Sequence, residues 1–350
     1  MTDPNHRRIL IVEVNWIGDV LFSTAAIRAL KNKYPQSYIG VLLHKRCSEI
    51  LAGNPYINEI IILDEKNEHR GLFGKLRLIR QLKSRQFDAV YLFHRSFTRA
   101  LICFLSGIKN RIGYYTTKRR FLLTENVHAP KEVIHRAVYY YYLVARSIPS
   151  DPRFLRCDFS VADQDITYVS SLLQKENTKD KTRLVVIHPV GNWLPKRWPK
   201  ENFAKLADVL VDKFGVGIIF SGASQEQNII NDILRLMKNK AINLCGKTTI
   251  KQLGALFIKA DLVVSADSGP LHLAVALNRP VVALFGPTSK DITGPLTQQN
   301  IVLLQKEINC IIPCYKENCS DNRCMKQISV KDVINAIEEK KWLANVKGKK

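Results

Sequence analysis

The chain has 350 residues, of which 46% are hydrophobic and 24% are charged, and its formal net charge is +22. This length suits two domains of ordinary size, and the composition excludes a disordered protein. No apolar run approaches the ~18–20 residues that a transmembrane helix needs, and the first residues lead straight into an apolar strand pattern, so we expect a soluble, cytoplasmic protein.

Strands and helices alternate through the first half of the chain. Continuous apolar runs predict strands, and helical spacing of apolar residues predicts helices. Near-continuous β-branched runs with intervening helices indicate a parallel sheet that is covered on both faces. The predicted strands are 8–14, 38–43, 59–63 and 89–93, and the predicted helices are 20–33, 75–85 and 139–148.

The second half repeats this alternation after a polar stretch that we interpret as the approach to a linker. Its predicted strands are 184–187, 217–220, 241–243, 262–265 and 281–284, and its predicted helices are 164–174, 201–214, 226–237, 250–260, 270–277 and 330–342. We therefore predict an α/β protein with two Rossmann-like, doubly wound domains facing a cleft. The expected boundaries are 1–165 and 166–330, followed by a C-terminal helix and basic tail at 331–350.

The positive charge is concentrated in the first half. Residues 1–150 contain 24 Lys and Arg but only 11 Asp and Glu, and the window from Ala89 to Thr124 contains seven basic residues and no acidic one. Such a surface suits a polyanion: nucleic acid, an anionic membrane or a phosphorylated glycolipid. The alternative is that the charge serves only solubility.

The segment HPVGNWLPKRWP, from His188 to Pro199, links a predicted strand to a predicted helix. Loops of this kind lie at the carboxyl edge of a parallel sheet, where open α/β folds bind their ligands. Its Lys196–Arg197 pair indicates an anionic ligand such as a nucleotide diphosphate. The alternative is a surface loop with a tryptophan packed under a helix.

A second strand-to-helix loop, NWIGDV, contains Gly18 and Asp19. The glycine would allow a substrate to approach the backbone closely. An aspartate at the start of a helix is more often a cap than a catalyst, because its carboxylate accepts hydrogen bonds from free amides. The loop lacks the full glycine fingerprint of a dinucleotide fold. The sequence assigns no role to Glu13, which precedes the loop.

Two further loops, ADSGPLHLA and FGPTSKD, follow consecutive predicted strands. Ser268, Gly269 and the amides that open the next helix form an anion-binding terminus. Asp267 can hold a sugar hydroxyl or cap the helix, and His272 can bind phosphate or pack. Thr288 lies in a tight turn that, beside the first loop, can complete a diphosphate pocket.

Eight cysteines occur in the chain, and four of them are scattered as expected for reduced core residues, namely Cys47, Cys103, Cys157 and Cys245. The other four are clustered at Cys310, Cys314, Cys319 and Cys324. Their spacing lacks the paired C-x2-C of common zinc sites, so we expect a compact loop of thiols, with a structural metal as the alternative.

Three segments, NWIGDVLFSTAAIRAL, HPVGNWLPKRWP and ADSGPLHLAVALNRPVVALFGPT, resemble in order and spacing glycosyltransferase family 9, the lipopolysaccharide heptosyltransferases, and within it the heptosyltransferase II branch. The resemblance covers nearly the whole chain, and the closing cysteine segment is also similar. It implies a GT-B fold whose first domain takes a Kdo- or heptose-bearing lipid A acceptor and whose second takes an ADP-heptose donor. It also implies inverting transfer with no metal or other cofactor required.

The resemblance places the catalytic base on Asp19 and the donor-phosphate lysine on Lys196. An inverting transfer needs one base to deprotonate the acceptor hydroxyl, and the leaving diphosphate needs positive charge nearby. The other expected donor contacts are Arg197, Asp267, Ser268, Gly269, His272 and Thr288. The expected acceptor contacts are Asn15, Gly18, Arg95, Arg119 and Arg120.

We further expect peripheral, electrostatic association with the anionic inner-membrane surface through the first domain. Two other functions remain open at this point. The fold could serve another nucleotide sugar, because relatives with other donors share these motifs. The chain could instead be a non-enzymatic, polyanion-binding protein, although it shows no nucleic-acid recognition signature and we expect no nucleic acid partner.

Overall fold

The structure is a computed structural model in which residues 7–176, 183–191, 193–296 and 299–344 are described. The chain divides into two compact units, unit 1 from Met1 to Ser160 and unit 2 from Val161 to Lys350. The domain boundary expected at 165–166 lies within α6 (Asp163–Lys175), which packs against α9 (Ile250–Lys259) of unit 2. Asn192 of the Lys196 loop and the basic tail at 345–350 lie outside the described residues.

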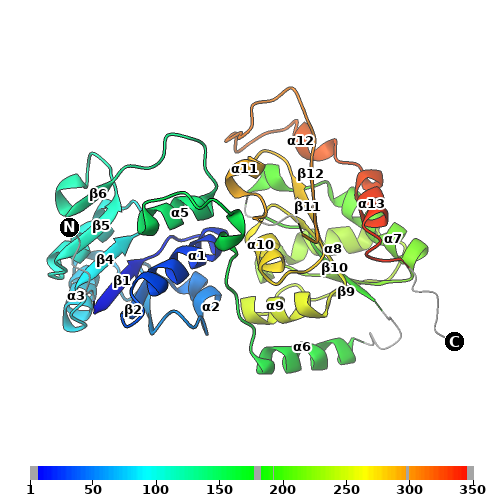
Figure 1. Cartoon of the computed structure of the whole chain (residues 1–350). Coiled ribbons are helices and arrows are strands. Elements are labelled where there is room, and N and C mark those ends of the chain that lie inside the picture. Colours follow the sequence, from blue (N-terminus) through cyan, green and yellow to red (C-terminus); the bar gives the residue numbers. More distant parts are fainter. Residues whose placement is uncertain (1–6, 177–182, 192, 297–298, 345–350) are drawn as a thin grey trace. The chain divides into compact units, whose positions relative to one another are not determined.

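Unit 1 is built on a six-stranded sheet in the order β3-β2-β1-β4-β5-β6, and every strand pair is parallel (Figure 1). Its elements are β1 (Arg8–Val12), α1 (Ile17–Lys33), β2 (Tyr38–His44), η1 (Lys45–Cys47), α2 (Ser48–Leu51), β3 (Glu59–Leu63), α3 (Gly71–Ser84), β4 (Ala89–Leu92), α4 (Phe97–Leu105), β5 (Asn110–Tyr114), η2 (Arg120–Leu122), β6 (Glu125–Val127), α5 (Arg136–Ala145) and η3 (Pro152–Leu155).

Unit 2 holds a second parallel sheet of six strands, in the order β12-β11-β10-β7-β8-β9. Its other elements are β7 (Leu184–His188), η5 (Leu194–Lys196), α7 (Lys200–Phe214), β8 (Gly217–Phe220), η6 (Ser224–Glu226), α8 (Gln227–Leu236), β9 (Ile242–Asn243), β10 (Leu262–Ala266), α10 (Gly269–Ala276), β11 (Val281–Phe285), α11 (Lys290–Thr293), β12 (Ile301–Gln305), α12 (Arg323–Lys326) and α13 (Val330–Glu339).

The central strands are apolar on both sides because helices cover both faces of each sheet. In unit 1, Leu10 and Val12 of β1 pack with Leu78 and Leu82 of α3 in one buried cluster. The opposite face carries α1, which packs along α5. In unit 2, β7 and β10 contribute to a buried cluster that also contains residues of α7, α8 and α13.

Both sheets have the doubly wound strand order, which confirms the predicted fold class. In each unit the order reverses between the first and fourth strands, β1 and β4 in unit 1 and β7 and β10 in unit 2. Such a reversal opens a crevice at the carboxyl ends of the two strands, and ligands of open α/β sheets bind there. The loops after these four strands therefore mark the places where a site is expected.

Several elements were not anticipated from the sequence, among them the short helices α2, α11 and α12 and four longer or sheet-forming elements. Three of these four, α4, β5 and β6, overlap or adjoin the acid-free window, and the fourth is β12 at the edge of the second sheet. Both β6 and β12 lie at a sheet edge and are only partly buried. The sequence of β6, ENV, carries no apolar run, whereas that of β12, IVLLQ, does carry one and was overlooked. Within the described residues, no helix is long and apolar enough to cross a membrane.

Candidate functional site

Asp19 lies in the first turn of α1, at the carboxyl edge of the first sheet. Its Oδ1 accepts a hydrogen bond of 2.8 Å from the Tyr140 hydroxyl and lies 3.9 Å from Nε of Arg136. The cap residue of α1 is Trp16, and its side chain makes no capping bond. Asp19 is therefore no N-cap, and its partly exposed carboxylate is held by residues of α5 instead.

Tyr140 is well suited to remain a donor to Asp19. Burial and the neighbouring Asp19 carboxylate raise the pKa of Tyr140 well above its ordinary value, so the hydroxyl keeps its proton. The tyrosine is itself fixed by packing, with its ring 5.5 Å from that of Phe93 at the end of β4. The orientation of Asp19 therefore depends on a residue 121 positions along the chain.

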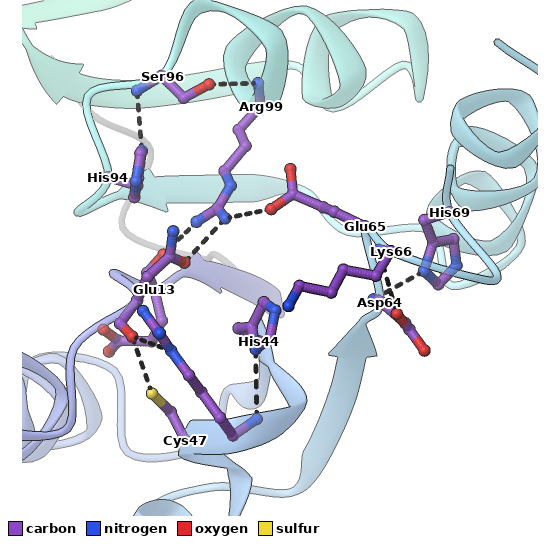
Figure 2. Close-up of polar contacts among 12 residues, drawn as sticks. Glu13, His44, Cys47, Asp64, Glu65, Lys66, His69, His94, Ser96 and Arg99 are labelled. Carbon is purple, nitrogen blue, oxygen red and sulfur yellow. Dashed lines mark hydrogen bonds and ion pairs between the residues drawn. The ribbon is translucent and has the colours of Figure 1, made fainter. Parts of the chain in front are cut away.

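Arg99 links the loops that follow three strands of the first sheet (Figure 2). Its guanidinium donates to the backbone oxygen of Glu13 at 2.8 Å, to Oδ1 of Asn15 at 2.9 Å and to Oε2 of Glu65 at 3.2 Å. The carbonyl of Asn15 also accepts from Arg46 Nε at 2.8 Å. Asn15 is thus rigidly held beside Asp19, in the loop at the sheet's reversal.

Two neutral imidazoles lie at the same edge. Nδ1 of His44 accepts from the Arg46 amide at 3.3 Å, and Nδ1 of His94 accepts from the Ser96 amide at 3.0 Å. Burial, assisted by the charge of Arg99, lowers the pKa of His94 to about 4, and burial also lowers the pKa of His44. Each ring therefore carries its proton on Nε2, where it can donate to a polar ligand.

Glu13, the residue that follows β1, is fully buried. Ser23 Oγ lies 2.7 Å from Glu13 Oε1 and 2.7 Å from the Val20 carbonyl, and the Val14 amide donates to Oε2 at 3.1 Å. Since a hydroxyl has one proton, both Ser23 contacts are satisfied only if Glu13 carries a proton of its own. In agreement, burial outweighs these bonds and raises the pKa of Glu13 to about 8.

The basic residues of the acid-free window do not form one surface. Arg95 and Arg120 are exposed, as an acceptor contact requires. Arg119 is completely buried, and its guanidinium donates to the carbonyls of Tyr114 and His94 at 2.7 Å each. Its expected role as an acceptor contact is therefore corrected: Arg119 ties the loop after β5 to the loop after β4.

In unit 2 the residues expected to bind the donor converge on Asp267, which follows β10. Lys196 Nζ lies 2.7 Å from Asp267 Oδ2, the Thr288 hydroxyl donates to the same oxygen at 2.6 Å, and His272 Nε2 lies 3.6 Å from Oδ1. Asp267 is 3% exposed and Lys196 is 22% exposed. Three loops that the sequence separates by up to 92 positions thus meet at one buried carboxylate.

The charge of Asp267 is stabilised within the protein. Burial alone would raise the pKa of Asp267, but His272 and the Lys196 ammonium outweigh it and lower the value to about 2. Lys196 is accordingly anchored by its ion pair, while its side chain stays partly exposed. Such an ammonium could hold the phosphate of a ligand while its stem stays fixed.

The other expected donor residues surround this cluster. Ser268 precedes α10 and makes no side-chain capping bond, so the amides at Gly269 are left for another acceptor. Arg197 Nε donates to the Gly191 carbonyl at 3.1 Å. Trp198 is 3% exposed, and its Nε1 donates to the Ile328 carbonyl at 2.8 Å, so this tryptophan packs in the core.

A family model described as glycosyltransferase family 9 (heptosyltransferase) matches residues 75–324. The chain belongs to glycosyltransferase family 9. Membership in this family makes it a glycosyltransferase and removes the non-enzymatic, polyanion-binding alternative.

Individual relatives agree with the family. The chain is 29% identical over 310 residues to "Lipopolysaccharide heptosyltransferase 2" of Escherichia coli K12, covering 85% of this chain and 87% of the relative. The solved "E. coli ADP-heptose lps heptosyltransferase II" is 25% identical with a TM-score of 0.79, covering 96% and 98% of the two chains. A family 9 structure from Veillonella parvula, 22% identical, shares the fold with a TM-score of 0.86 over 98% of both chains.

The cysteine cluster of this family 9 chain surrounds a pocket in unit 2. All four thiols line it together with Pro195 of the Lys196 loop and Pro287 of the GPT turn. Among the residues that the structure describes, no three His, Cys, Asp or Glu side chains are placed to hold a metal ion. The four cysteines are free thiols. Of the four scattered cysteines, Cys47, Cys103 and Cys245 are buried as expected, whereas Cys157 is only partly buried.

Sequence reasoning missed Glu13, His44, His94 and Tyr140. A glutamate in an otherwise apolar strand, as in RILIVEV, is a signal that could have singled out Glu13. His44 ends β2 and His94 follows β4, both at the edge where ligands of this fold bind. Nothing local marks Tyr140, which lies in a run of four tyrosines and is chosen by its position on α5.

Proposed function

We propose that this family 9 enzyme transfers a heptose, with inversion, from ADP-heptose to the inner core of lipopolysaccharide on a Kdo- or heptose-bearing lipid A. The names of its relatives support the donor and acceptor classes. The observation that carries the proposed mechanism is the carboxylate of Asp19, oriented by Tyr140 at the reversal of the first sheet. The enzyme is proposed to work in the cytoplasm at the inner-membrane surface.

In the proposed reaction, Asp19 accepts the proton of the attacking acceptor hydroxyl. The hydroxyl oxygen forms a bond to the anomeric carbon as the bond from that carbon to the diphosphate oxygen breaks. The electron pair of the breaking bond passes to ADP, whose added charge is stabilised by Lys196, Arg197 and the amides that open α10. Asn15, Gly18, Arg95 and Arg120 are proposed to contact the acceptor.

The proposal assigns Asp267 the task of positioning Lys196 rather than of touching the sugar. Its Oδ2 already binds both Lys196 and Thr288, so the lysine and the GPT turn share one anchor. A metal is not required in this scheme, because the positive charge is supplied by side chains and backbone amides.

The experiment that tests the base is transfer by the Asp19→Asn variant from ADP-heptose to a core acceptor. An amide cannot take the proton, so kcat should fall by about 100-fold or more while ADP binding is retained. Near-normal turnover in this variant would refute Asp19 as the base. A calorimetric panel of nucleotide sugars tests the donor separately, and preference for a hexose or N-acetylhexosamine donor would replace heptose in the proposal.

A further inference from the structure

Unit 1 exposes a group of large apolar side chains near the starts of α3 and α4. The exposed fractions are 70% for Leu72, 85% for Phe73, 40% for Phe97 and 68% for Phe121. Single exposed apolar residues are ordinary, whereas a group of this kind marks an interaction surface. Together with Leu76, which is 36% exposed, we call these residues the apolar rim.

The fold brings the rim to one edge of the sheet. Leu72 and Phe73 lie in the first turn of α3, after β3; Phe97 begins α4, after β4; and Phe121 lies in η2, after β5. Because the strands are parallel, these three loops open on the same carboxyl edge. The rings of Phe97 and Phe121 are 6.2 Å apart, and α3 packs beside α4.

The charge around the rim is mostly of one sign. Residues 70–85, which include α3, contain six Lys and Arg and no acidic residue, and the window 89–124 contains seven and none. Of the exposed acids on the loop before α3, Glu65 is paired with Arg99 at 3.2 Å, and Glu68 lies 4.0 Å from His69 Nε2. Several basic side chains are exposed close to the rim in sequence, namely Arg70, Lys75, Arg77, Arg95, Lys118 and Arg120.

We propose that the apolar rim inserts into the interfacial layer of an anionic lipid bilayer, with the surrounding Lys and Arg side chains on the lipid headgroups. Exposed Phe and Leu side chains flanked by basic ones have the chemistry of a membrane-surface contact, where apolar burial and electrostatic attraction add. An acidic protein surface would match the charge but would leave the protruding rings without a lipid-like environment. The attachment expected from the charge alone is purely electrostatic, and the rim adds apolar insertion to it.

This inference deepens the proposed function and rests on it only for the identity of the glycolipid. The rim lies at the same carboxyl edge of the first sheet as Asn15, His94 and Asp19. A glycolipid could therefore keep its acyl chains in the bilayer while its sugars reach the polar cluster. Docking of the rim would then limit how far from the membrane a sugar can be glycosylated.

The experiment measures binding of the full chain to vesicles of phosphatidylcholine, alone or mixed with phosphatidylglycerol, at low and high salt. The test variant is Phe73→Ser/Phe121→Ser. The matched control is Ile311→Ser/Tyr315→Ser, which removes two side chains of unit 2 that are 84% and 77% exposed. All four residues are largely exposed, so folding should persist, as circular dichroism can verify.

Wild type should bind the mixed vesicles and keep some of that binding at high salt, because salt screens charges but not apolar insertion. The rim variant should partition about tenfold or more weakly, because two large apolar side chains no longer enter the bilayer. Its residual binding should disappear in high salt. The control variant should behave as wild type.

Equal vesicle binding by the rim variant and wild type would overturn the proposal, as would failure of wild type to bind mixed vesicles. Loss of a dimer in the rim variant, with vesicle binding unchanged, would assign the rim to a second copy of the chain. Transfer to a lipid-free core acceptor separates the two proposals: the rim variant should retain it. If wild type binds vesicles but transfers no heptose to a lipid-linked or a lipid-free core acceptor, the proposed function is refuted while the proposed docking surface is still supported.

Discussion

Because Lys196 forms an ion pair with Asp267, we expect the Lys196→Met substitution to destabilise the protein as well as to impair catalysis. The substitution removes the closest cation from a carboxylate that is 3% exposed. Against burial, His272 and Lys196 together lower the pKa of Asp267 to about 2, which corresponds to roughly 2 kcal/mol that the two partners share. Removing one partner of a buried pair costs about 3–5 kcal/mol, and the partial exposure of Lys196 favours a loss of about 2–3 kcal/mol.

Part of the lost stability should return when the unpaired Asp267 carboxylate is replaced by a neutral group. In the Lys196→Met/Asp267→Asn double variant the neutral amide can still bond to Thr288, so we expect at least about 1 kcal/mol of stability to return relative to additivity. Urea unfolding followed by tryptophan fluorescence measures this, because Trp193, Trp198 and Trp342 lie in unit 2 and only Trp16 lies in unit 1. The buried Trp198 lies two residues from the substitution.

The result that would refute this reasoning is a Lys196→Met variant as stable as wild type, or additive effects in the cycle. The expected destabilisation of Lys196→Met also determines which variant should be used to test the role of Lys196 in catalysis. Lys196→Arg keeps the positive charge on Asp267, so its ADP affinity and kcat can be compared with wild type in a folded protein. A loss of activity in Lys196→Met alone would not separate a donor contact from a weakened unit 2.

Three further outcomes are expected. Glu13→Gln should raise the free energy of unfolding at pH 7 by about 3 kcal/mol, since the new amide can donate to Ser23 while accepting from Val14. The pKa of Glu13 is about 8 in the folded protein and 4.5 in the unfolded chain, so wild type loses stability as the pH rises between these values. The same pH dependence of the unfolding free energy in wild type and variant, measured by urea titrations from about pH 5 to 8, would contradict this. Tyr140→Phe should lower kcat by about tenfold with an unchanged fold, whereas Tyr141→Phe, on the same helix, should not, and equal rates for both would remove the positioning role. Arg119→Met should lower the free energy of unfolding, measured in urea, by about 1–3 kcal/mol, because the buried carbonyls of Tyr114 and His94 lose their donor. Unchanged stability together with weaker acceptor binding would instead support the acceptor contact expected from the sequence.

The central strands and the loops after them could be predicted from the sequence because their signal is local. Continuous apolar runs such as LVVIH and LVVSA report burial on both faces of a sheet, and glycine or proline marks where they end. The same logic places Lys196, Asp267 and Thr288 at one sheet edge from the sequence alone. The carboxylate of Asp267 joins Lys196 and Thr288 into one cluster. This contact depends on the strand order of the sheet and could not be predicted from the spacing of the residues in the sequence.

Charge was the least reliable guide, because a count of basic residues carries no information about burial. Arg99 and Arg119 belong to the acid-free window, yet both are at most 4% exposed and bind carbonyl or carboxylate oxygens inside unit 1. Their planar guanidiniums bridge loops that a lysine could not span with several bonds. The exposed aromatic residues of the same window, such as Phe121, gave no signal in the charge pattern at all.

The division of the chain after Ser160 has a consequence for how such enzymes can diversify. Each unit has a complete doubly wound sheet and its own buried cluster, and a single chain crossing joins them. Recombination between Ser160 and Val161 would therefore exchange whole modules without cutting a core. If unit 1 binds the acceptor as proposed, a chimera that takes unit 1 from another member of the family should fold and inherit that member's acceptor preference, and new glycans would then arise by exchanging halves rather than by redesigning a pocket.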